Sequence, residues 1–366
     1  MIALAITMGV GRFAFTPILP LMQLDSGLSI PAGSWLAFAN YAGTLAGALT
    51  AVAVPVPLAV AIRAGLLAIG LSTVGMALAH GFVAWLLLRA LAGLAVGWVL
   101  PLVSAWALER LASHVPALRS AVFAGFGVGI AGAGVLCLGL MQASAHSSTA
   151  WLLLGLLSLL LTAILWRRFD EAAPGRAARR AASAPSTAGG GGRARVVVCY
   201  GAFGFGYIVP ATFLPVMARE VVRDPAIFGW AWPLFGLAAA VSTVLAGTFV
   251  TALGTRRLWI VGHVVMALGV IAPVVWSGVG AIVLSALLVG ATFTVITMAG
   301  FEEGRRLAGP HGTRMIATMA VAFNIGQLAG PIGVRYALTT VGDFSRPLLA
   351  AALVLVLSAV ALAPRS

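Results

Sequence analysis

Stretches of apolar residues long enough to cross a lipid bilayer recur along the whole chain, and this feature limits the possible folds more than any other. A membrane-spanning helix needs roughly 20 predominantly apolar residues. Of the 366 residues, 61% are hydrophobic and 8% are charged, which is too few charges to cover the surface of a water-soluble domain of this length. The stretches are longer than barrel strands and lack their alternation of polar and apolar residues. The sequence therefore predicts an all-α polytopic membrane protein.

We expect twelve transmembrane helices in two sets of six. Their approximate ranges are 1–22, 34–54, 61–79, 83–107, 120–142 and 150–168, then 196–218, 228–250, 258–276, 280–301, 316–338 and 347–363. Residues 167–195 are rich in Ala, Gly and Pro and carry seven Arg, a composition typical of a flexible, solvated linker. The chain thus divides into an N-terminal half (1–166), a linker (167–195) and a C-terminal half (196–366).

The net charge of +13 would favour nucleic-acid binding in a soluble protein, but here every basic residue is an arginine and most lie in short loops. With the N-terminus inside, sixteen arginines fall in inward-facing segments and three in outward-facing loops. Membrane proteins carry such an excess of positive charge on the cytoplasmic side. We therefore expect both termini and the linker in the cytoplasm, and no nucleic-acid partner.

An internal repeat relates the two sets of spans at an offset of 195 residues. The matching pairs are Gly9 with Gly204, Gly11 with Gly206, Leu19 with Leu214, Pro20 with Pro215, Met22 with Met217, and Trp35 with Trp230. Six spans separate the copies, so both copies run in the same direction through the bilayer. Two parallel six-helix repeats are the architecture of the major facilitator superfamily.

Three stretches carry a resemblance to one branch of that superfamily, the YbfB/YjiJ-type transporters. They are GVGRFAFTPILPLM in the first span, YGAFGFGYIVPATFLPVMARE in the seventh and FNIGQLAGPIG in the eleventh. The resemblance covers nearly the whole chain apart from the linker. It implies a secondary transporter of the bacterial inner membrane that works by alternating access without a cofactor. It leaves the substrate, the direction of transport and a coupling proton open, and nothing in the sequence requires more than a monomer.

Arg12 lies in the first apolar stretch, roughly 15 Å along its helix and close to the bilayer midplane. An arginine at that depth costs from about 2.5 to more than 10 kcal/mol, so its side chain should face water, protein or substrate rather than lipid. Thr16 shares its face. Pro17 and Pro20 remove hydrogen bonds to carbonyls of the preceding turn, those of Phe13 and Thr16, and should leave acceptors beside that face. We expect Arg12 to bind substrate or to act in gating; the alternative is a structural tie to carbonyls of a neighbouring helix.

Arg89 in the fourth span lies in one row with Gly93 and Gly97. The glycines allow a neighbouring helix to approach closely, and an arginine followed four residues later by glycine resembles a motif of proton-coupled antiporters. Arg89 therefore either reaches the central cavity or extends outward to the lipid headgroups.

Other polar residues at membrane depth indicate a polar central cavity as a group, although each alone fits an interhelical hydrogen bond as well. They are Asn40, Tyr41, Tyr207, Thr212, Asn324 and Gln327. The last two lie three residues apart and share a helix face.

Helix bends and anchors are expected at further positions. Pro210 and Pro215 should break the seventh span as Pro17 and Pro20 break the first, and Gly330 with Pro331 should bend the eleventh. Tryptophans near span ends are expected to anchor at the membrane interface, namely Trp35, Trp230 and Trp232.

None of the nine acidic residues lies deep in a span. A proton-driven carrier of cations usually needs a buried carboxylate, whereas a cavity that holds arginine without a fixed anion attracts anions. We therefore predict a small organic anion or a polar carboxylate-bearing solute as the substrate, with its negative group on Arg12. The alternative is an efflux pump, a proton antiporter for hydrophobic drugs or sugars. Neither an enzyme nor a metal site is expected, because the histidines lack acidic or cysteine partners.

Overall fold

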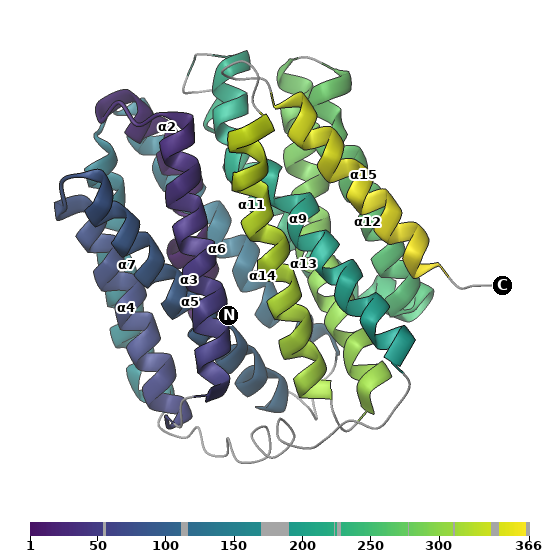
Figure 1. The fold of residues 1–366 in the computed structure, drawn as a ribbon. Coiled ribbons are helices and arrows are strands. Elements are labelled where there is room, and N and C mark those ends of the chain that lie inside the picture. Colours follow the sequence, from purple (N-terminus) through teal and green to yellow (C-terminus); the bar gives the residue numbers. More distant parts are fainter. Residues whose placement is uncertain are drawn as a thin grey trace.

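The computed structural model describes residues 1–53, 56–110, 116–169, 190–222, 224, 228–276, 278–309, 312–337 and 344–363, and these residues form helices and no strands. Figure 1 shows two groups of long helices side by side, the purple and blue ones on the left and the green and yellow ones on the right. Nine helices in the described ranges are long and apolar enough to cross a membrane. The predicted all-α membrane fold is confirmed.

The twelve expected spans are all present. Those of the N-terminal half are the composite of α1 (Ile2–Ala5), η1 (Ile6–Arg12) and α2 (Phe15–Asp25), then α3 (Ile30–Ala53), α4 (Leu58–Leu78), α5 (Phe82–Arg110), α6 (Pro116–Gln142) and α7 (Ser147–Leu165). Those of the C-terminal half are α9 (Gly190–Val221), α11 (Ala231–Leu253), α12 (Thr255–Val275), α13 (Val279–Ala308), α14 (Gly312–Ala337) and α15 (Ser345–Leu362).

The segment between the halves begins and ends in helix. A short helix, η2 (Trp166–Phe169), follows α7, and Phe169 is buried against the ring of Trp106. Residues 190–195 are the first turns of α9. Residues 170–189 of the expected flexible linker lie outside the described residues, and the division of the chain at 167–195 stays a prediction. The end of the bundle that carries η2 and the start of α9 is called the linker side below.

The first span is interrupted next to Arg12. Residues 6–12 form a π-helix, whose wider turns place the N–H of Phe13 on the carbonyl of Met8 at 2.9 Å. The carbonyl of Phe13 accepts the N–H of Thr16 at 3.1 Å, so the prediction that Pro17 frees this carbonyl is wrong. The interruption comes from the π-helix and its end rather than from the prolines alone.

The prolines of the seventh and eleventh spans do not end their helices. Pro210 and Pro215 lie inside the continuous helix α9, and Pro331, after Gly330, lies inside α14. The predicted break of the seventh span is therefore wrong. Membrane helices tolerate such prolines because neighbouring helices and side chains satisfy the backbone groups that a proline leaves without a partner.

Glycines bring α3 and α5 into backbone contact, and the repeat reproduces this contact in the other half. A Cβ on Gly93 would collide with the carbonyl of Asn40, and a Cβ on Gly97 with that of Thr44. In the C-terminal half, a Cβ on Gly290 of α13 would collide with the carbonyl of Phe235 in α11. Because Phe235 lies 195 residues after Asn40, the internal repeat seen in the sequence is also a repeat of packing.

The halves meet closely between α6 and α11, where Gly127 packs on Gly236 and Gly134 on Pro233. They also meet between α2 and α9, near the middle of the bundle and away from the linker side (Figure 1). The prediction that Trp232 anchors the chain at the membrane interface is wrong. This side chain lies at the start of α11, is fully buried and stacks on Phe235. These contacts enclose the central residues discussed next.

Candidate functional site

Arg12 links the two halves at the centre of the bundle. Its side chain is only 3% exposed. Its Nη2 donates to Gln327 Oε1 on α14 and lies 3.5 Å from the hydroxyl oxygen of Tyr207 on α9. The amide nitrogen of Gln327 in turn donates to the Tyr207 hydroxyl. The three side chains therefore form one hydrogen-bonded group made from both halves.

The internal repeat explains why Arg12 meets Tyr207. Tyr207 lies 195 residues after Arg12, at the equivalent position of the second repeat. One helical turn further on, Thr16 Oγ1 donates to the carbonyl of Ala211 at 3.2 Å, and these two residues are also 195 apart. Equivalent residues can touch only where the approximate two-fold axis between the repeats passes, so Arg12 lies on this axis.

Aromatic rings surround the guanidinium group of Arg12. Its central carbon lies 5.1 Å from the ring centroid of Tyr41, 5.6 Å from that of Phe13 and 6.0 Å from that of Phe323. Cation–π contacts of this kind stabilise a desolvated arginine. They also exclude water, which strengthens every charge interaction at this place.

Arg89 holds the backbone of the interrupted span. Its side chain is 2% exposed and its Nη2 donates to the backbone carbonyl of Arg12 at 3.1 Å. The rings of Phe15 and Trp151 flank it at 5.2 and 5.8 Å. Arg89 thus neither reaches the lipid headgroups nor enters the centre with its charge, and acts on Arg12 through the backbone.

Asn40 completes this arrangement. Its Nδ2 donates to the carbonyl of Gly11 at 3.1 Å and to that of Arg89 at 3.0 Å. The carbonyls of Gly11 and Arg12 lie at the end of the π-helix, where the helical hydrogen-bond pattern changes, and they accept from Asn40 and Arg89. The two side chains therefore set the orientation of Arg12.

The remaining predicted residues divide into two groups. Tyr41 and Thr212 join the halves through their hydroxyl groups, 2.9 Å apart. Asn324 is buried, but its Nδ2 donates to Ala320 of its own helix at 2.8 Å, so the structure does not bring it to Arg12. Thr16 lies at the contact between the halves, as described above.

The partners of both central arginines are neutral. Arg12 bonds to an amide and a hydroxyl, Arg89 to a carbonyl, and the Nε of each is buried with no hydrogen-bond partner among the described residues. The acidic side chains with described contacts lie at helix ends, where Asp25 bonds to Ser147 and Glu303 to Arg306. The buried charge of Arg12, which has no acidic partner among the described residues, makes the centre an attractive place for an anion.

Sequence reasoning missed the aromatic part of the centre. The ring of Tyr207 stacks between those of Phe293 and Phe323, with centroids 4.8 and 5.5 Å away. Phe13 packs on Phe293 at 6.0 Å and on Trp232 at 5.7 Å. An apolar ring in an apolar span has no distinguishing pattern, although Phe323 lies four residues before Gln327 and thus on its face.

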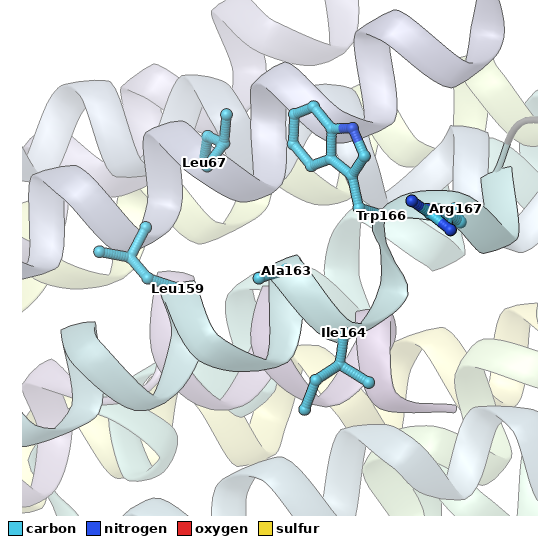
Figure 2. Close-up of a pocket in the computed structure, with 6 residues that line it drawn as sticks. All are labelled: Leu67, Leu159, Ala163, Ile164, Trp166 and Arg167. Carbon is cyan, nitrogen blue, oxygen red and sulfur yellow. The ribbon is translucent and has the colours of Figure 1, made fainter.

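A separate groove of about 420 Å³ lies between α4 and α7 on the linker side (Figure 2). Its lining consists of Leu67, Leu159, Ala163, Ile164, Trp166 and Arg167. Ile164 is 63% exposed, so the groove is on the outside of the bundle and does not include Arg12. In the described part of the chain, no group of three His, Cys, Asp or Glu side chains could hold a metal ion.

A family model and several solved structures each match nearly the whole chain. A family model described as uncharacterised MFS-type transporter YbfB matches residues 4–363. A D-xylose–proton symporter superposes with a TM-score of 0.75 at 14% identity, covering 98% of this chain and 95% of its own. A mutant of the nucleoside transporter NupG gives 0.68 at 14% identity, with 98% and 97% covered. The human organic anion transporter MFSD10 gives 0.66 at 14% identity, with 99% and 98% covered. No curated protein sequence matches the chain.

Proposed function

The chain belongs to the YbfB-type family of major facilitator superfamily transporters, and from this premise we propose that it carries a small organic anion or a carboxylate-bearing solute. It is a multi-pass membrane protein and a secondary transporter rather than an enzyme. The solved structures that it resembles are named for a nucleoside, an organic anion and a sugar, so the shared fold does not select a substrate. Selection must come from the side chains at the centre.

The observation that carries the proposal is the burial of Arg12, whose partners among the described residues are all neutral. A guanidinium group desolvated in this way gains most from a carboxylate, which accepts two parallel hydrogen bonds from it. Gln327 and Tyr207 occupy two donor sites of Arg12 in this structure. A substrate carboxylate would replace these weaker, neutral partners.

The position of Arg12 on the axis between the halves supports alternating access. The described contacts of the first span with α9 run from Arg12, at the end of η1, to Gln23 in α2. The Oε1 of Gln23 accepts from Arg219 at 3.3 Å, away from the linker side. This conformation is therefore closed on the side opposite the linker. Residues 1–166 would rock against 196–366 around Arg12, and the opposite closure would expose the site to the other side.

The arginine distribution supports a placement in the bacterial inner membrane with both termini and the linker in the cytoplasm. In that orientation the contact of α2 with α9 described above closes the outward-facing side. The site is complete within one chain, which favours a monomer.

A thermal-unfolding screen tests the proposal. Purified protein is heated with carboxylates, sugars and cationic drugs, beside the variant Arg12→Ala and the control Arg305→Ala, whose exposed side chain pairs only locally with Glu302. We expect carboxylates to raise the unfolding temperature of the wild type and the control but not of Arg12→Ala. If cationic or neutral compounds stabilise all three proteins equally, Arg12 is structural and an efflux function for such compounds takes first place.

A further inference from the structure

The two halves contribute different chemistry to the centre. In the N-terminal half, Arg12, Asn40 and Arg89 supply charge and amide groups. The positions 195 residues after Arg12 and Asn40 hold Tyr207 and Phe235. The charge therefore comes from the N-terminal half, whose Phe13 and Tyr41 also lie beside it, and the C-terminal half adds the rings of Tyr207, Phe293 and Phe323. A ligand that lies between the halves meets both.

The rings of the C-terminal half form a continuous surface that begins at Arg12. Phe323 lies 6.0 Å from the guanidinium carbon, its ring stacks on Tyr207, and Tyr207 stacks on Phe293. Phe293, Tyr207 and Phe13 are buried, whereas Phe323 is partly exposed. Phe323 also lies nearer than Gln327 to the start of α14, which is on the linker side. A molecule that approaches Arg12 from this side passes the face of Phe323.

Few hydrogen-bonding groups around Arg12 remain for a substrate rich in hydroxyls. Thr16 bonds to a carbonyl, Tyr41 bonds to Thr212, and the Nδ2 of Asn40 donates to two carbonyls, which leaves its Oδ1 as an acceptor without a described partner. A hydroxyl group that loses water without gaining a partner costs free energy. Aromatic faces offer it none, whereas they bind a flat apolar body through dispersion and ring stacking.

One guanidinium group serves the substrate. Arg89 is engaged with the carbonyl of Arg12 and lies between Phe15 and Trp151, so only Arg12 faces the contact between the halves. A second carboxylate on the substrate would have no cationic partner and would be buried among rings, at a high desolvation cost.

We infer that the substrate is a monocarboxylate with a flat aromatic or similarly apolar body. Arg12 binds the carboxylate, and the ring surface formed by Phe323, Tyr207 and Phe293 binds the body. This inference rests on the proposed anion transport and narrows it to one substrate class.

Equilibrium binding to the purified protein by titration calorimetry tests this inference with four probes of similar size. Benzoate has the carboxylate and the ring, benzamide lacks the charge, gluconate replaces the ring with hydroxyls, and succinate carries a second carboxylate. We expect benzoate to bind at least about tenfold more tightly than each of the other three.

Variants of the ring surface provide the second part of the test. Phe323→Leu should weaken benzoate binding about three- to tenfold, because a stacked ring contact is lost while apolar volume is nearly kept. The control is Phe213→Leu, whose fully buried ring packs on Phe344 at 5.4 Å; this change should leave the affinity unchanged. If Phe323→Leu elutes as an aggregate in size-exclusion chromatography, Phe293→Leu takes its place with the same expected loss.

The failures of the two proposals are distinguishable. Gluconate or succinate binding more tightly than benzoate, with the affinity lost in Arg12→Ala, overturns the aromatic monocarboxylate and leaves anion transport standing. An unchanged benzoate affinity in both ring variants overturns the inference as well. The proposed anion transport itself is contradicted if benzamide binds as tightly as benzoate. It is also contradicted if none of the carboxylates binds.

Discussion

Gln327 gives the central arginine a neutral hydrogen-bond partner, which a substrate can displace. Its amide oxygen accepts from Arg12 and its amide nitrogen donates to Tyr207, so it joins the two halves without a charge. A glutamate at this position would form a buried ion pair with Arg12. Such a pair holds an arginine far more firmly than an amide does. The neutral amide therefore leaves the positive charge available to a ligand.

Gln327→Glu should weaken carboxylate binding while the protein stays folded. The new side chain occupies Arg12 as a fixed anion, so we expect the affinity for benzoate to fall by at least about tenfold, or 1.4 kcal/mol. Calorimetric titration measures this change. The matched control is Gln23→Glu, which makes the same substitution opposite another arginine, Arg219, at the end of α2. An unchanged affinity in Gln327→Glu would show that the carboxylate does not bind at Arg12.

At the scale of single elements, the interruption of the first span is the feature that places Arg12. The π-helix ends at Arg12, and the carbonyls of its last two residues accept from side chains of α3 and α5. The same two helices are fixed to each other by the backbone contacts of Gly93 and Gly97. Arg12 is thus oriented by a rigid pair of helices from its own half.

Asn40→Leu should destabilise the protein and weaken substrate binding together. The change leaves the carbonyls of Gly11 and Arg89 without their side-chain donor, which costs about 1–3 kcal/mol. The free energy of unfolding and the benzoate affinity should both fall. Asn324→Leu is the control, because the one described hydrogen bond of Asn324 goes to a carbonyl of its own helix. Equal losses in the two variants would contradict the role assigned to Asn40.

The repeated glycine contacts predict a matched pair of effects. Gly93→Ala and Gly290→Ala each place a methyl group against a backbone carbonyl of the neighbouring helix. We expect each to lower the free energy of unfolding by about 1–3 kcal/mol. Gly139→Ala on α6 adds the same methyl group where no atom lies within 4 Å, and should be neutral or slightly stabilising. Thermal unfolding of the three variants checks this, and a neutral Gly93→Ala would refute the close α3–α5 contact.

The elements of the fold were predictable from the sequence to a large extent. Apolar stretches of the right length predicted twelve spans, because the bilayer fixes the length of each helix. The π-helix was not predictable, since glycine and proline spacing does not distinguish it from a proline kink. The aromatic centre was missed for a related reason. Phe293 and Phe323 are distinguished from other apolar residues of their spans by their contacts with Tyr207, and the sequence does not reveal these contacts. Arg12 stood out because its burial costs so much.

On the scale of the whole molecule, the approximate two-fold symmetry places unlike residues at equivalent positions. Arg12 meets its own repeat equivalent, Tyr207, and Thr16 meets Ala211. In a fully symmetric molecule, two identical side chains would meet at this position. Here the guanidinium group of Arg12 meets the hydroxyl group of Tyr207. Rocking of the halves must break this contact in each cycle. The contact is therefore both the binding site and part of the gate.

Bridging the halves away from the linker side should stop transport reversibly. Gln23→Cys together with Arg219→Cys, joined by a reducible bis-thiosulfonate reagent, would hold α2 on α9. We expect exchange of radiolabelled benzoate by proteoliposomes to fall to the background and to return on reduction. The control pair is Arg63→Cys with Trp166→Cys, which contact each other within the N-terminal half. Full exchange by the bridged Gln23–Arg219 pair would rule out rocking at this contact.

The position of a bound carboxylate tests the central claim most directly. Crystals grown with 4-iodobenzoate would reveal the iodine atom by its anomalous scattering and the carboxylate in the electron density. We expect the carboxylate on the guanidinium group of Arg12, with the iodinated ring against Phe323 and the iodine atom directed away from the charge. Iodine found only in the outer groove lined by Leu67, Ile164 and Arg167, with the contact of Arg12 and Gln327 intact, would contradict it.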